Sequence, residues 1–207
     1  MKSVLISIRP EWCEKIVNGK VTIEVRKSAP KEFPFKAYIY CTKAKSKWQY
    51  SDYEGAYVNS KDEIVYAQQH IIGEFICDKI YPIKAERYDG GSTECSRKTV
   101  FTLLPAEEHN ALLNATQLTN EEIFAYLGGE GKWGYAWHIS DLKIYDKPKE
   151  LSEFYAPCPI ENKDCENCIR YGKPYDWDFD EKQGLIYCTR RLSRPPQSWQ
   201  YVEEMKE

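Results

Sequence analysis

Residues 19–27, GKVTIEVRK, hold a carboxylate and a guanidinium two positions apart. In an extended strand, alternate side chains point to opposite faces, so Glu24 and Arg26 share one face and Ile23 and Val25 share the other. A carboxylate can accept hydrogen bonds from the exocyclic amine or ring N–H of a nucleobase. An arginine can clamp a phosphate or stack on a base. The polar face is therefore either a solvated strand surface with an ion pair or the floor of a binding site.

Four further residues near this pair are candidates for ligand contacts: Arg9, Lys20, Thr22 and Lys27. They belong to a cationic part of the chain, because residues 1–50 hold 11 Lys and Arg against four Glu, a balance of +7. The formal net charge of the whole chain is −3, which leaves −10 for the remaining residues. This asymmetry predicts a surface for an anionic partner, with lysine-rich loops that only keep the chain soluble as the alternative.

A second set of candidate ligands occurs near the C-terminal end, where four of the eight cysteines fall within 31 residues. They have the spacing C-x6-C-x2-C-x19-C and are Cys158, Cys165, Cys168 and Cys188. A C-x2-C pair lets two thiolates bind one metal from a turn, and two more complete a closed, structural zinc site. Zinc would supply folding energy that so short a tail cannot obtain by burying apolar area. An iron–sulfur cluster and unliganded thiols are the alternatives.

The other four cysteines are single residues expected to pack without reacting: Cys13, Cys41, Cys77 and Cys95. The tail also contains three arginines close together, Arg190, Arg191 and Arg194. Such a cluster either holds phosphates or forms an exposed, solubilising end.

The elements that position these residues are short. Alternating or apolar segments predict strands over residues 3–9, 19–27, 35–43, 70–83, 99–104 and 132–146. A helix with Pro10 in its first turn and an apolar stripe from Trp12 to Val17 is closed by Gly19. A second helix begins at the T-x-x-E capping box of Thr119 and is expected to bury Ile123, Tyr126 and Leu127. Residues 44–68 and 84–98 are expected to be loops.

Aromatic residues make up 14% of the chain, with 16 Tyr and 6 Trp. They are either core and cross-strand packing or stacking platforms for bases. In the strand at 132–146, Trp133, Tyr135 and Trp137 share one side, which we expect to be core. On the other side, His138 is expected to be a hydrogen-bonded structural residue.

With 42% hydrophobic and 29% charged residues, the chain is of the globular class. Its 207 residues suit one domain of ordinary size with a smaller appendage. The composition changes around residue 147, so we expect a domain over 1–147 and a linker with a cysteine-rich tail over 148–207. Strands outnumber the short helices, which predicts an α+β fold built on a small mixed β-barrel, plus a small C-terminal segment stabilised by the four-cysteine metal site.

No apolar run approaches the roughly 18 residues that a membrane span needs. The first residues enter a patterned strand at once and leave no room for a signal peptide. We therefore expect a cytoplasmic protein, in which cysteines are thiols or metal ligands and not disulfides.

The opening segment ISIRPEWCEKIVNGKVTIEVRK resembles the start of ASCH domains, members of the PUA-like superfamily of small β-barrels. The shared elements are Arg9 and Pro10, the helix that ends in Gly19, and the T-x-E-x-R strand. The resemblance covers residues 2–27, extends loosely to about 146, and is absent from the cysteine-rich tail.

This resemblance implies a cleft between the barrel strands and the first helix, floored by the polar face of the strand. Members of the family are inferred to bind RNA or modified nucleotides. The residues expected to do so in this chain are Arg9, Lys20, Thr22, Glu24, Arg26 and Lys27.

Some small members of the family are amidohydrolases that act on N4-acetylcytidine, with the strand pattern G-x-K-T-x-T-x-R. Here Val21 occupies the lysine position and Glu24 the second threonine position. Lys20 is no substitute, because neighbouring residues on a strand point to opposite faces. The leading interpretation is an RNA or modified-nucleotide binding module. The alternatives are a nucleoside or amide hydrolase with Glu24 as general base, and a protein-interaction scaffold whose tail docks a partner.

Overall fold

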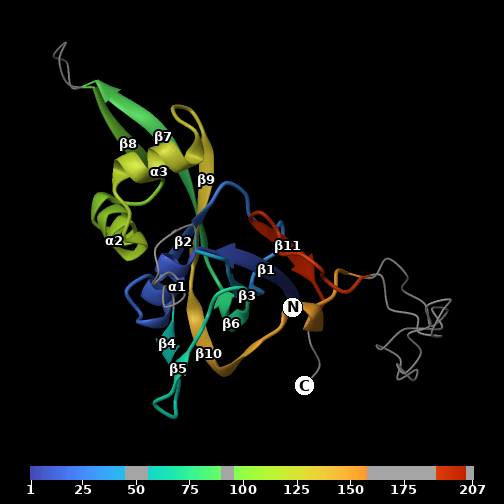
Figure 1. Cartoon of the computed structure of the whole chain (residues 1–207). Coiled ribbons are helices and arrows are strands. Elements are labelled where there is room, and N and C mark those ends of the chain that lie inside the picture. Colours follow the sequence, from blue (N-terminus) through green and yellow to red (C-terminus); the bar gives the residue numbers. More distant parts are fainter. Residues whose placement is uncertain (45–55, 90–95, 158–189, 204–207) are drawn as a thin grey trace, which may run out of the picture.

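A computed structural model describes residues 1–44, 56–89, 96–157 and 190–203 of the chain (Figure 1). The described part contains three α-helices, one sheet of five strands, one of four, and a small two-stranded sheet. This confirms the α+β class. The strands in these ranges form separate sheets and not the single closed barrel that we expected. None of the described helices is long and apolar enough to span a membrane.

The five-stranded sheet is built around a strand that is buried on both faces. Its strands, in spatial order, are β10 (Ser140–Lys149), β6 (Ile71–Cys77), β3 (Phe35–Cys41), β1 (Lys2–Ile8) and β11 (Trp199–Val202). In β1, Val4 and Ile6 enter one apolar cluster, whereas Leu5 enters a second cluster on the opposite face. This double burial explains why the consecutive residues Val4, Leu5 and Ile6 are all apolar. Helix α1 (Pro10–Val17) packs Cys13 and Ile16 into the first cluster.

The four-stranded sheet carries two helices on one face (Figure 1). Its strands, in spatial order, are β2 (Ile23–Arg26), β9 (Trp133–His138), β7 (Ile80–Asp89) and β8 (Ser96–Thr102). Helices α2 (Ala106–Thr116) and α3 (Asn120–Leu127) bury their apolar side chains against Ile23, Val25 and Ala136 of this sheet. One side of β2 is therefore fully used for packing, and Glu24 and Arg26 project from the other side of this edge strand.

Two strands expected from the sequence are each divided where the chain passes from one sheet to the other. The predicted strand 70–83 is β6 and β7, separated at Asp78 and Lys79, and the predicted strand 132–146 is β9 and β10, separated at Ile139. The charged pair Asp78 and Lys79 marks the first corner, but apolar residues resume directly after it, so the sequence was read as one continuous strand. The two corners touch, because His138 Nδ1 lies 2.6 Å from Asp78 Oδ1. His138 is thus hydrogen-bonded, as expected.

Several described elements were absent from the sequence-based prediction. Helix α2 was not predicted, since its buried residues are only Leu112 and Thr116. Residues 84–98 were predicted to form a loop. This prediction is wrong at both ends of the segment, where residues of β7 and β8 pair with each other. The expected loop 44–68 contains the short strands β4 (Tyr57–Val58) and β5 (Ile64–Val65). A 3-10 turn at Leu151–Glu153 follows β10.

The last described residues return to the first sheet. Strand β11 pairs antiparallel with β1, with Ser3 opposite Val202 and Ile6 opposite Trp199. Part of the segment 148–207, which the sequence assigned to a separate tail, therefore lies within the main sheet. Cys158, Cys165, Cys168 and Cys188 lie outside the described residues, as does Cys95.

Candidate functional site

The polar face of β2 holds an enclosed ion pair. Arg26 Nη2 lies 2.9 Å from Glu24 Oε1, and the two side chains are only 8% and 13% exposed. Ile23 and Val25 point into the cluster beneath α2 and α3, which confirms the predicted alternation. The face is consequently not the open, solvated surface that the sequence left as one possibility.

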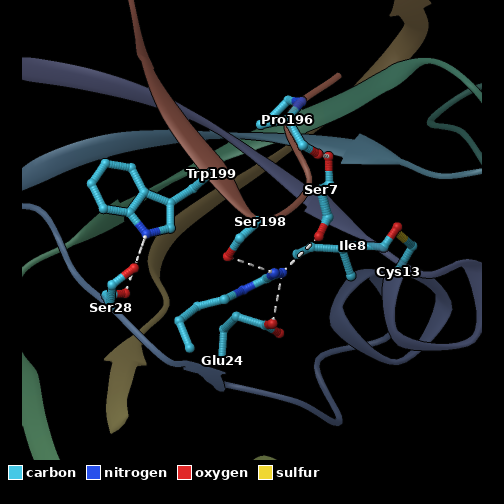
Figure 2. A network of polar contacts seen from close by, with 9 residues as sticks. Ser7, Ile8, Cys13, Glu24, Ser28, Pro196, Ser198 and Trp199 are labelled. Carbon is cyan, nitrogen blue, oxygen red and sulfur yellow. Dashed lines mark hydrogen bonds and ion pairs between the residues drawn. The ribbon is translucent and has the colours of Figure 1, made fainter. Parts of the chain in front are cut away.

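The Arg26 guanidinium connects three segments of the chain. Its partners Glu24, Ser7 and Ser198 are labelled in Figure 2. Its Nη2 donates to the carbonyl oxygen of Ser7 at 2.7 Å, and its Nη1 donates to Ser198 Oγ at 3.5 Å. Ser7 in turn donates its backbone N–H to the Ser198 carbonyl at 2.9 Å and its hydroxyl to the Pro196 carbonyl at 2.6 Å. The pair thus joins β2 to the end of β1 and to the residues before β11. We call these residues, with Glu24, the Arg26 network.

One donor of this guanidinium is not used. Arg26 Nε is buried and has no hydrogen-bond partner among the described residues. A buried donor without a partner carries a desolvation cost.

Burial governs the ionisation of the groups around the pair. It raises the pKa of Glu24, and the neighbouring Arg26 charge offsets this only in part. It also raises the pKa of the buried Cys13 thiol well above its usual value, with Cys41 and Glu24 acting in the same direction. Cys13 is therefore a protonated packing residue and not a nucleophile.

Tyr126 of α3 completes the candidate site. Burial raises the pKa of its phenol, and it lies close enough to the pair that Arg26 and Arg9 lower this pKa while Glu24 raises it. Lys27 Nζ lies 5.5 Å from the centre of its ring. Because the ring is still 40% exposed, it can offer a surface to a ligand.

The sequence grouped six ligand-contacting residues, and the structure brings only part of that group together. Glu24 and Arg26 form an ion pair, Lys27 lies over the Tyr126 ring, and the charges of Glu24, Arg26 and Arg9 all act on the pKa of Tyr126. Lys20 and Thr22 are exposed and precede β2, where their backbone N–H groups donate to the carbonyls of Lys15 and Ala115. No contact between described residues joins these two side chains to the other four residues.

Sequence reasoning missed Tyr126 as a site residue and placed it in the buried stripe of its helix. The buried residues of α3 are Ile123, Phe124 and Leu127. Phe124 is therefore buried where we expected Tyr126 to be. The predicted capping box is confirmed, with Thr119 and Glu122 bonded to each other's backbone N–H groups. The 3.6-residue repeat allows either Phe124 or Tyr126 to share a face with Ile123 and Leu127, so helical periodicity alone could not identify Tyr126 as a site residue.

The arginines of the tail line a different site. An open hollow of about 390 Å³ is bounded by Arg190, Arg191, Arg194 and Gln200 together with neighbouring residues. Arg191 Nη2 donates to the Tyr155 hydroxyl at 3.2 Å. None of these residues takes part in the Arg26 network.

No group of three or more His, Cys, Asp or Glu in the described ranges is placed to hold a metal ion. Three described cysteines, Cys13, Cys41 and Cys77, are free and buried. The structure therefore does not test the predicted zinc ligands.

No family model matches the sequence, and no curated protein does. The structure is similar to the crystal structure of ASCH from Zymomonas mobilis, with 18% identity and a TM-score of 0.45 over 98% of this chain and 89% of that one. Two single-residue mutants of that protein each give 17% identity, with TM-scores of 0.49 and 0.45. They cover 98% and 99% of this chain and 89% and 92% of their own. Identities and TM-scores of this size do not establish family membership.

The raised pKa of Glu24 predicts a specific pH dependence of stability. The folded protein holds a proton on Glu24 at pH values where the unfolded chain has lost it. The contribution of this group to the free energy of unfolding is therefore complete below its ordinary pKa and is lost as pH rises through the raised value. Relative to Glu24→Gln, the wild type should gain stability in urea unfolding as pH falls from about 7 to about 4.

Glu122→Gln provides the matched control on α3. Hydrogen bonds from Thr119 lower the pKa of Glu122, so its contribution to stability should be lost as pH falls. A wild-type advantage over Glu24→Gln that is constant with pH, or that shrinks in acid, would contradict this account of Glu24.

Proposed function

We propose that the chain binds RNA or a modified nucleotide at the Glu24–Arg26 pair, with Tyr126 as a stacking surface. The observation that carries the proposal is the burial of this ion pair beside a partly exposed aromatic ring. Buried ion pairs contribute little net stability, because desolvation offsets their attraction. The raised pKa of Glu24 shows that this cost is not fully offset. Besides linking β2 to the end of β1 and to Ser198, the pair in this proposal takes part in ligand recognition.

The residue types suit a nucleotide. The Glu24 carboxylate can accept hydrogen bonds from a base, and the unused Nε of Arg26 can donate one. A base stacked on the Tyr126 ring would lie near the Lys27 ammonium, and stacking of this kind depends little on base identity. Arg9 and Lys27 are exposed and cationic, which suits contacts with the phosphates. The resemblance of residues 2–27 to ASCH domains fits the same assignment.

Neither alternative is favoured by an observation at this site. Hydrolysis would need a nucleophile, yet Val21 packs in the apolar core at the position where related amidohydrolases have lysine. Glu24, the proposed general base, is paired with Arg26. The scaffold alternative depends on tail residues that lie mostly outside the described ranges.

The four tail cysteines give a second proposal, a structural zinc ion bound by Cys158, Cys165, Cys168 and Cys188. Their C-x2-C spacing supports it. The described cysteines do not compete as ligands, since burial raises the pKa of Cys13 well above its usual value and that of Cys77 to about 12. Metal binding requires thiolates, which these two sites disfavour.

Metal analysis of the purified chain tests the zinc proposal. We expect one zinc per chain and its loss in Cys168→Ser, whereas the buried Cys77→Ser control should retain the metal. A purified chain that contains no metal, or one that contains iron in place of zinc, contradicts the assignment.

RNA binding itself is tested by titrating short single-stranded oligomers of mixed sequence over a range of salt concentrations. Arg26→Lys keeps the charge but loses the planar fork, so we expect the affinity to fall about tenfold or more. Arg9→Ala and Lys27→Ala should each lower the salt slope by about one, because each removes a phosphate contact.

Lys31→Ala, an exposed lysine outside the site, is the matched control and should leave affinity unchanged. Thermal unfolding of each variant shows that a loss of affinity is not a loss of fold. RNA binding that is indifferent to salt, or that survives Arg26→Lys unaltered, would rule out this site.

A further inference from the structure

The face of the four-stranded sheet that carries the ion pair continues beyond it as an exposed aromatic surface. The strand register places Arg26 opposite Tyr135, Trp133 opposite Lys84, and Lys84 opposite Phe101. Residues directly opposite each other in antiparallel strands share a face, as do residues two apart in one strand. All five side chains therefore lie on one side of the sheet. We call Tyr135, Trp133, Lys84 and Phe101 the aromatic platform.

Burial changes sharply along this face. Trp137, opposite Glu24, is fully buried, and Tyr135 is half-buried against the same core. Trp133 and Phe101 are 53% and 48% exposed. Helices α2 and α3 pack against the other face of the sheet (Figure 1). The platform thus begins at the candidate site and extends away from it.

The named charges of this face balance one another, so they neither repel nor strongly attract an anionic chain. Lys84 Nζ lies 5.6 Å from the centre of the Trp133 ring, between the two exposed aromatic side chains. Both carboxylates of the face are paired, Glu86 with Lys84 at 2.5 Å and Glu24 with Arg26. No unpaired carboxylate on the described strands of this face repels a phosphate. Because the platform has only one lysine, aromatic stacking must supply most of any affinity.

We propose that the aromatic platform binds unpaired bases of a single-stranded RNA whose neighbouring nucleotide occupies the Glu24–Arg26 site. This inference rests on the proposed function and adds that the RNA is single-stranded. Strands lie about 4.8 Å apart and rise about 3.4 Å per residue, so Trp133 is about 7 Å from Tyr135 and about 10 Å from Phe101. Rings at these separations can each receive one base. In a duplex the bases are stacked on one another and cannot reach them.

The test compares a short single-stranded RNA of mixed sequence with its duplex, using wild type, Trp133→Ala and Phe101→Ala. Each substitution should weaken single-strand binding by about 5- to 100-fold, as expected for the loss of one stacked base. The salt slope should not change, since no phosphate contact is removed. Duplex binding should be weaker than single-strand binding in the wild type. Tyr66→Ala removes a comparably exposed aromatic outside this sheet and should have no effect.

The outcomes separate this inference from the proposed function. If Arg26→Lys weakens RNA binding but Trp133→Ala and Phe101→Ala do not, the platform proposal is wrong and the proposed function stands. If the wild type binds no RNA, both are wrong. Equal affinity for duplex and single strand overturns the platform proposal. So does a concentration-dependent dimer that Trp133→Ala dissociates, because a second copy of the chain would then cover this face. Both aromatic residues are exposed, so unfolding midpoints should remain near that of the wild type.

Discussion

The Arg26 guanidinium is the constraint on which the described structure depends. A cation buried to this extent must be paired, and its partners come from three places: Glu24 on the same strand, Ser7 at the end of β1, and Ser198 just before β11. These contacts connect the edge strand of one sheet to the edge of the other. They also determine where the chain returns after the cysteine-rich segment, since Ser7 binds the backbone of the same C-terminal residues.

The same constraint leaves the ion pair available for recognition. One face of β2 is committed to the apolar cluster beneath α2 and α3, so Glu24 and Arg26 must face the opposite way. The capped start of α3 then sets the rotation of that helix, which places Tyr126 beside the pair. Along β9 the shared face changes from buried Trp137 to exposed Trp133. A polar pair at the boundary between core and open aromatic surface is an arrangement suited to a flat, polar ligand.

Local patterns in the sequence predicted local structure well. The alternation of polar and apolar residues predicted both faces of β2. Pro10 and Gly19 predicted where α1 begins and ends, and the capping box predicted the start of α3. Other features were missed: the charged pair Asp78 and Lys79 was read as part of one strand, and the pairing of β11 with β1, which joins opposite ends of the chain, has no local signal. The Ser198 contact with Arg26 is missed for the same reason. The four tail cysteines remain a prediction from spacing alone.

The central claim is that the buried guanidinium recognises a nucleotide and is not only a structural link between the sheets. The most direct measurement is the NMR resonance of the Arg26 Nε–H group during titration with short single-stranded RNA. Because this donor has no partner among the described residues, we expect its resonance to shift as the RNA binds and to saturate with the same affinity as the whole complex. RNA that binds while the Arg26 Nε–H resonance stays unchanged would contradict the claim.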